Sequence, residues 1–227
     1  MARPFTASDD EILLAARKVL DKHGPDAFSI AEVANQVGLS RAAIILRFKS
    51  THALKVASLE KLVQQFTQVL ETLPKTPSGD NVLRLAAMIG SHMRSRESSV
   101  RFFANYYATS VRDRELLNLE RRRGDALRAA ISRVMPETTI EHDATVVAFR
   151  ANLTGSIMAW HSLDDSDSRR YLVLRSAEWL SLARIPFSKQ VVQELTAPQA
   201  TSTAQVRSKT PRSAPPRKRR PKSADVG

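Results

Sequence analysis

A short segment near the amino terminus gathers five side chains that could hydrogen-bond to an anionic or planar partner. They are two serines and three cations: Ser29, Ser40, Arg41, Arg47 and Lys49. The planar guanidinium group of Arg41 matches the O6 and N7 acceptors of guanine in the major groove of DNA, although a solvated surface arginine is equally compatible with the sequence. Each serine can cap a helix, and the free N–H groups at a helix start also suit a phosphate. The segment thus holds groups for reading a base edge and for contacting the phosphate backbone.

Catalytic and metal-binding chemistry has no comparable support in the sequence. The histidines form no HExxH or similar ligand spacing: His23, His52, His92, His142 and His161. The chain has no cysteine, no Gly-x-Ser-x-Gly nucleophile motif and no glycine-rich phosphate loop. The sequence therefore predicts a protein that is not an enzyme and that needs no cofactor and no metal.

The first element that positions this segment is a helix from Ser8 to about His23. Ser8 and Glu11 have the spacing of a capping box, in which hydroxyl and carboxylate each satisfy a free backbone N–H group. Apolar residues then recur every three or four positions until Gly24-Pro25, which favours a left-handed cap and ends the helix.

Two further short helices follow with an abrupt turn between them. Ser29 and Glu32 repeat the capping-box spacing, Gly38 permits a turn that a Cβ atom would oppose, and Ser40 caps the third helix. Two helices held at a steep angle by such a turn form a helix-turn-helix, which presents its second helix to the major groove. The same pattern also occurs as plain core packing.

Residues 12–54, ILLAARKVLDKHGPDAFSIAEVANQVGLSRAAIILRFKSTHAL, resemble the DNA-binding domain of the TetR family of bacterial transcription regulators. Residues 41–48 are similar to that family's recognition helix. The resemblance implies a homodimer that reads a palindromic double-stranded DNA operator, and a larger helical domain that binds a small-molecule effector and changes the spacing of the two DNA-binding domains.

The resemblance also implies a set of DNA-contacting positions. They are Ser29, Ser40, Arg41, Ala42, Ala43, Ile45, Leu46, Arg47, Lys49 and Thr51. The family usually has threonine, aromatic residues and lysine at positions 43, 45, 47 and 51, so the phosphate contacts of this chain are expected to be weaker, with Arg47 and Lys49 replacing some of them. Ile45 and Leu46 suit either contact with thymine methyl groups or burial in the core.

The rest of the chain also reads as helical, which predicts an all-α fold of about nine helices. Helices are expected at residues 51–72, 80–94, 97–110, 113–135, 141–160 and 167–184, separated by proline-, glycine- and aspartate-rich segments. The predicted organisation is a helix-turn-helix domain over residues 1–50, an effector-binding and dimerisation domain over residues 51–186, and a disordered basic tail over residues 187–227.

Two features of the larger domain suggest sites. Aromatic and polar residues that could line a ligand pocket are His92, Phe103, Tyr106, Tyr107 and Asn152, although such residues also pack in ordinary cores. Small residues recur at three- and four-residue intervals at Ala144, Ala148, Ala151, Gly155 and Ala159. This seam suits close approach of a helix, either from a second subunit or from the same one.

Charge and composition fit a cytoplasmic protein with a polyanionic partner. The chain has 227 residues, 42% of them hydrophobic, and it shows neither an apolar run long enough for a bilayer nor a secretory signal. Its net charge is +12, and residues 207–225 hold eight lysines and arginines against one aspartate. The tail is compatible with a non-specific DNA tether or with a solubilising extension.

Together these patterns favour a sequence-specific, ligand-released transcriptional repressor. The alternative is a protein-interaction or partner-regulating module whose helix-turn-helix no longer recognises a specific DNA sequence. The residues Ala43, Ile45 and Thr51 suggest this alternative.

Overall fold

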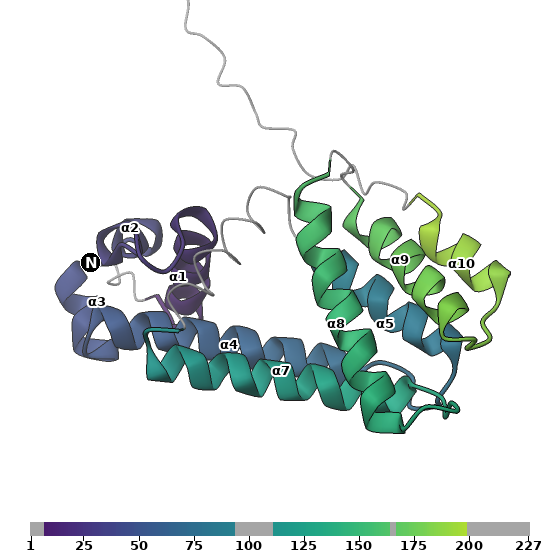
Figure 1. Cartoon of the computed structure of the whole chain (residues 1–227). Coiled ribbons are helices and arrows are strands. Elements are labelled where there is room, and N and C mark those ends of the chain that lie inside the picture. The colour runs from purple at the N-terminus through teal and green to yellow at the C-terminus, as the bar shows by residue number, and fades with distance from the viewer. Residues whose placement is uncertain (1–6, 94–110, 164–166, 199–227) are drawn as a thin grey trace, which may run out of the picture. The chain divides into compact units, whose positions relative to one another are not determined.

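The computed structural model describes residues 7–93, 111–163 and 167–198, and these residues form helices and no strand. The helices lie within one compact unit, Met1–Ala197. They are α1 (Asp9–His23), α2 (Ile30–Val37), α3 (Arg41–Phe48), α4 (Thr51–Glu71), α5 (Gly79–His92), α7 (Arg114–Val134), α8 (His142–His161), α9 (Ser168–Leu182) and α10 (Lys189–Thr196). The predicted all-α class is confirmed (Figure 1).

The capping box that begins α1 is present. Ser8 N donates to Glu11 Oε2 over 2.7 Å, and Glu11 N donates to Ser8 Oγ over 3.2 Å. The backbone and hydroxyl hydrogen bonds from Ser8 lower the pKa of the Glu11 carboxyl group. A negative charge is therefore held at the positive end of the α1 dipole.

The second capping box, expected from Ser29 and Glu32, is only half formed. Ser29 Oγ accepts from Glu32 N over 3.4 Å, but the Glu32 carboxylate turns toward α1 instead of the helix start. It contacts Lys22 Nζ at 2.9 Å and His23 Nε2 at 2.8 Å, and the Lys22 hydrogen bond is the main cause that lowers the pKa of Glu32. A charged partner on a neighbouring helix thus outcompetes a local N–H group.

The first four helices share one hydrophobic cluster, which holds α2 and α3 against α1 and the start of α4. Its fully buried members include Ile12, Val19, Val33, Ile44 and Leu54. This small core fixes the angle at which α3 leaves the domain, because interdigitated apolar side chains tolerate little displacement.

α4 and α7 run side by side in the same direction (Figure 1). Polar contacts join them at a nearly constant sequence offset of 62 or 63 residues: His52 with Glu115, Arg122 with Glu60, and Arg133 with Glu71. At the far end, Arg133 also donates to the Leu70 carbonyl oxygen over 2.6 Å. The pair therefore behaves as one elongated element that begins beside α1, α2 and α3.

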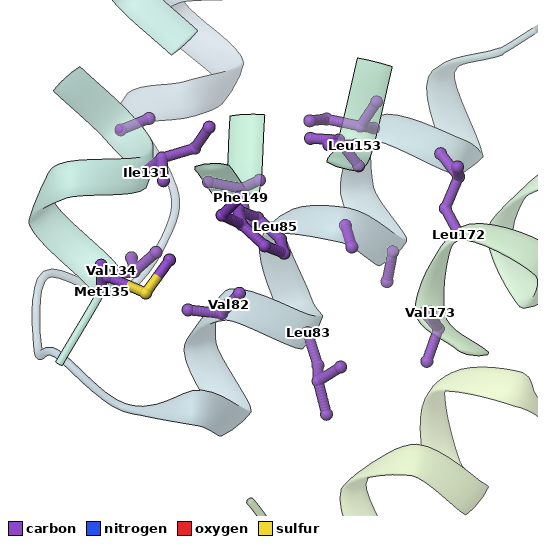
Figure 2. Packing of buried hydrophobic residues seen from close by; sticks show 14 of the residues in the cluster. Val82, Leu83, Leu85, Ile131, Val134, Met135, Phe149, Leu153, Leu172 and Val173 are labelled. Atoms are coloured by element: carbon purple, nitrogen blue, oxygen red, sulfur yellow. The ribbon is translucent and has the colours of Figure 1, made fainter. Parts of the chain in front are cut away.

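The main core of the larger domain lies among α5, α7, α8 and α9. Figure 2 shows Leu85 of α5 beside Phe149 of α8, with Ile131 of α7 close by and Leu172 of α9 on the other side of α5. Phe149 also meets Trp179 edge-on, with ring centroids 5.1 Å apart. This core anchors the end of α4–α7 that is distant from α3.

The helical bounds agree with the sequence prediction to within two residues, with one difference. Residues 189–196, expected to belong to the disordered tail, form α10. The reason is an amphipathic pattern in which Val191 and Leu195 are buried against the main core, while Ser188 caps the helix start. The helix expected at 97–110 lies outside the described residues.

Candidate functional site

Three serine caps and one glycine turn set the position of α3. Ser29 caps α2, and Gly38 ends it with φ 66° and ψ 27°, a left-handed conformation that favours glycine. Ser40 Oγ then accepts from Ala43 N over 3.1 Å, and Ser50 Oγ accepts from Ala53 N over 3.0 Å at the start of α4. The helix-turn-helix predicted from these residues is present.

Helix α3 divides into an inward and an outward face. Ile44 is fully buried, and Phe48 is half-buried against the same cluster. The residues exposed to solvent are Arg41, Ala42, Ile45, Leu46, Arg47 and Lys49. Leu46 is 85% exposed and Ile45 is 37% exposed, so the structure excludes burial in the core for these residues. Both side chains face solvent and neither is a core residue.

Arg47, predicted to replace a phosphate contact, also makes contacts within the chain. Its guanidinium group donates to the Ala7 carbonyl oxygen and lies 3.6 Å from Asp9 Oδ1. These contacts tie the last turn of α3 to the residues that begin α1. The sequence pattern gave no sign of this, because the two ends of the contact are separated by 40 residues.

Lys49 closes α3 in a conformation that is unusual for a lysine. Its φ is 67°, and its backbone N–H donates to the Ile45 carbonyl oxygen over 2.7 Å. A glycine would adopt this φ with less strain. Of the other predicted contact positions, Ala42 is exposed, whereas Ala43 and Thr51 are half-buried.

The segment that contains α1, α2 and α3 carries little net charge of its own. Residues 7–50 contain six lysines and arginines and six aspartates and glutamates. Arg17 pairs with Asp21 at 2.7 Å, and Lys22 pairs with Glu32. Arg41 and Lys49 are therefore the cations of α3 and its cap that remain directed to solvent without an acidic partner in the described chain.

A separate hydrophobic cluster joins α1 to α4 and α7. Leu20 of α1, Leu59 and Val63 of α4, and Leu116 and Leu119 of α7 are all buried in it. Polar contacts surround this junction. Lys61 pairs with Asp10, and Ser58 Oγ donates to the Leu13 carbonyl oxygen over 3.2 Å. A shift of α7 relative to α4 must therefore move α1 or break this packing.

The predicted ligand-binding residues are only partly described. Phe103, Tyr106 and Tyr107 lie outside the described residues. His92 is exposed at the end of α5, and its Nδ1 lies 2.8 Å from the Met88 carbonyl oxygen. Asn152 is half-buried in α8, and its Nδ2 atom is buried without a hydrogen-bond partner in the described chain. Further along α8, burial lowers the pKa of His161.

An open groove of about 480 Å³ lies between α4 and α7, lined by Val63, Gln64, Thr67, Gln68, Arg122, Asp125 and Ala126. Of the predicted ligand-binding residues that the structure describes, neither His92 nor Asn152 lines it. Four of its polar side chains are exposed to solvent, which differs from the mostly apolar lining of small-molecule pockets. The groove is a surface feature of the α4–α7 pair.

The small-residue seam of α8 faces solvent. From Ala144 onward, every exposed residue of α8 is uncharged: Ala144, Val147, Ala148, Ala151, Thr154, Gly155, Met158 and Ala159. Val147 is 57% exposed and Met158 is 41% exposed. Sequence reasoning found the small members of this face but missed these two larger ones, which share the periodicity of Ala151 and could have been found from it.

The described residues offer no metal site and no membrane span. No group of three or more histidine, aspartate or glutamate side chains is arranged to hold a metal ion there. None of the helices in that part of the chain combines the length and apolar character needed to cross a bilayer.

Comparison with known proteins gives a family match and a common fold. Residues 12–57 match the family described as bacterial regulatory proteins, tetR family. No curated protein sequence matches the chain.

Several solved structures share the architecture. A transcriptional regulator from Rhodococcus sp. Rha1 has 16% identity and a TM-score of 0.64, with 80% of this chain and 100% of that chain covered. A TetR transcription regulator from Haloarcula marismortui has 17% identity and a TM-score of 0.65, with 77% of this chain and 97% of that chain covered. The multidrug binding protein EbrR, complexed with proflavin, has 19% identity and a TM-score of 0.53, with 75% of this chain and 98% of that chain covered.

The family match covers the helices whose packing exposes α3, and the shared fold extends over the larger domain. Residues 12–57 thus match the tetR family of bacterial regulatory proteins, and the chain shares the fold of these solved structures.

Proposed function

We propose that the chain is a cytoplasmic, homodimeric repressor that binds a palindromic operator through α3 and is released when a small molecule binds its larger domain. The observation that carries the proposal is the exposed face of α3, mounted at one end of the α4–α7 pair in a chain whose residues 12–57 match the tetR family. The dimer, the coupling between the two domains and the ligand site are each supported by a separate feature of the described residues.

The uncharged face of α8 supports the dimer. An exposed stripe without charge along most of a 20-residue helix is unusual for a surface that stays in water. Its small residues allow close approach of a second helix, and a Cβ atom at Gly155 would meet no atom within 4 Å. A twofold dimer would place the same face of each subunit against the other and remove both from water.

The α4–α7 pair supports coupling between the two domains. Its polar contacts and the buried junction at Leu20 and Leu116 connect the larger domain to the helix-turn-helix. A dimer must present its two α3 helices about 34 to 36 Å apart, or at a multiple of that distance, to fit successive major grooves. A ligand that favours another spacing weakens operator binding by its difference in affinity for the two forms, typically about 1 to 3 kcal/mol.

The ligand site is proposed in the larger domain, near Asn152 and the other residues named from the sequence. The buried, unpartnered Nδ2 of Asn152 supports this, because a buried polar nitrogen gains a hydrogen bond when an acceptor arrives. EbrR, whose fold is similar, is complexed with proflavin, so this architecture can hold a small organic molecule.

Arg41 provides the first test of operator reading. We expect Arg41→Ala to weaken specific binding by about 1 to 3 kcal/mol and to relax preference at one guanine of each half-site, because alanine cannot form the bidentate hydrogen bonds of a guanidinium group. The measurement is fluorescence anisotropy with duplexes recovered by selection from fragmented genomic DNA of the source organism. A selection that recovers no preferred sequence at low salt would contradict the proposed function.

The matched control is Arg121→Ala, which removes an exposed arginine from α7. It changes the net charge by the same amount, so it reports the general electrostatic effect of losing one cation. Equal losses of affinity and unchanged sequence preference in both variants would show that Arg41 does not read a base.

The basic tail provides a second test. Because residues 7–50 are electrically balanced, we expect residues 207–222, which lie outside the described residues, to supply part of the phosphate binding. Replacing Arg217, Lys218, Arg219 and Arg220 with alanine should reduce the slope of log affinity against log salt by about 0.9 for each phosphate that the tail no longer neutralises, without changing the selected sequence. Binding would be titrated over a range of salt concentrations.

A variant with lysine at positions 217, 219 and 220 keeps the charge and should keep the salt dependence. If the alanine variant has the same slope as the wild-type chain, the tail makes no phosphate contact and is a solubilising extension.

The alternative function is a partner-regulating module with a degenerate helix-turn-helix. Exposure of Leu46 favours it, since an uncovered leucine also suits a protein surface. This alternative predicts salt-sensitive binding to DNA without sequence preference and no effect of Arg41→Ala on preference.

A further inference from the structure

The side chains that α3 can offer to a partner follow from its contacts. Ile44 is buried, Phe48 is packed on the domain core, and Arg47 is held by Ala7 and Asp9. Four of the remaining exposed residues lie at positions i, i+3, i+4 and i+7 of the helix and its cap: Ala42, Ile45, Leu46 and Lys49. These intervals place them on one side of a helix, with Arg41 beside Ile45.

The chemistry of this face is mostly apolar. Arg41 and Lys49 are its hydrogen-bond donors, and both are at its ends. Its centre consists of Ala42, Ile45 and Leu46, which offer methyl and methylene groups and no polar atom. Hydrogen-bond reading of adenine or cytosine needs amide or carboxylate side chains, which this centre lacks.

One feature of a base edge can make an apolar contact with the centre of this face. In the major groove, thymine presents a C5 methyl group beside its O4 acceptor, whereas no other base carries a methyl group there. Covering that methyl group with Leu46 removes apolar surface of both partners from water, and this transfer is favourable in proportion to the area covered. Leu46 is 85% exposed and Ile45 is 37% exposed, so Leu46 has more apolar surface to remove from water in such a contact.

We propose that the centre of the α3 face reads the operator through thymine methyl groups, with Leu46 and Ile45 as the specificity-determining residues and Arg41 reading an adjacent guanine. This inference rests on the proposed operator binding and names the base chemistry that the operator must carry. Each half-site therefore contains at least one thymine whose methyl group is covered by Leu46 or Ile45.

The test uses the full-length protein and duplexes enriched from a random-sequence library. Each thymine of the enriched half-site is replaced in turn by deoxyuridine, which keeps the base pair and O4 and removes only the methyl group. At a contacted position the affinity should fall about fourfold, the equivalent of about 0.8 kcal/mol for one buried methyl-sized group. Thymines outside the contacted positions should show no change on replacement.

Variants of the protein separate a methyl contact from a general effect on the duplex. In Leu46→Ala or Ile45→Ala, the penalty for deoxyuridine at the contacted position should shrink toward onefold, because the partner of the methyl group is gone. Leu14→Ala is the matched control, since Leu14 is 56% exposed on α1 and lies outside the α3 face. It should retain the full penalty, and circular dichroism would verify that all three variants are folded.

The outcomes distinguish the inference from the function on which it rests. Sequence-specific binding with equal affinity for thymine and deoxyuridine duplexes would overturn the inference and leave the proposed function intact. A deoxyuridine penalty that persists unchanged in both α3 variants would also overturn it. Failure to enrich any sequence would overturn the proposed function itself and favour a protein partner for this face.

Discussion

A glutamate at position 151 is expected to convert the protein from a dimer to a monomer and to lower its operator affinity by about two to four orders of magnitude. Ala151 lies in the middle of α8, is exposed in the subunit, and has only uncharged exposed neighbours on this face from Ala144 to Ala159. Burying a carboxylate there without a cation is costly, and a twofold interface doubles the cost because each subunit carries the substitution.

The loss of operator affinity follows from geometry rather than from any change in α3. A dimer that has bound one half-site holds its second α3 at a high effective concentration near the other half-site, whereas a monomer binds each half-site independently. Light scattering would report the oligomeric state, and anisotropy with the selected duplex would report affinity. Affinity for a duplex with a single half-site should be nearly unchanged.

Ala197→Glu is the control for this substitution, since Ala197 is an exposed alanine that follows α10 and lies far along the chain from α8. It should leave both the dimer and the operator affinity intact. A stable dimer of Ala151→Glu with wild-type affinity would show that α8 is not the interface, and another surface would then have to join the subunits.

Sequence patterns predicted most structural features that depend on neighbours in the chain, although the local pattern of α10 was missed. The capping box at Ser8 and Glu11, the turn at Gly38 and the cap at Ser40 each involve groups within three or four residues, and all are present. The periodicity of buried residues likewise predicted the helices, because one face of each helix must meet a core.

Features that depend on distant residues could not be predicted in this way. Glu32 has the correct spacing for a capping box, yet Lys22 and His23 on the preceding helix take its carboxylate. Arg47 has the position of a phosphate contact, yet Ala7 and Asp9 hold it. In both cases a local pattern competes with a charged or polar partner that only the tertiary fold brings within reach.

The face of α3 shows the same limit in another form. The sequence left Ile45 and Leu46 open between burial and exposure, because eight residues span little more than two helical turns and the apolar stripe is wide. The structure assigns Ile44 to the core and Ile45 and Leu46 to solvent. The dimer face and the ligand residues remain proposals, since they concern a second subunit and a molecule that a single chain does not contain.

The neighbouring isoleucines of α3 give the second prediction. Ile44→Ala should destabilise the DNA-binding domain by about 2 to 5 kcal/mol, because it removes three methyl-sized groups from a fully buried position and leaves a cavity. Ile45→Ala makes the same chemical change one residue later, at a side chain that is 37% exposed, and should cost less than about 1 kcal/mol. Backbone hydrogen exchange of the α1–α3 amides would measure both losses in the domain concerned.

The two variants should separate folding from recognition. Ile44→Ala should weaken operator binding only because it lowers the fraction of folded domain. This loss of affinity should therefore diminish when a stabilising osmolyte restores the hydrogen-exchange protection of the domain. Ile45→Ala should weaken binding to the selected duplex at every level of protection, because the side chain is removed from the surface that meets DNA and not from the core. If the two substitutions instead cost equal stability and equal affinity, the division of α3 into a core face and a reading face is wrong.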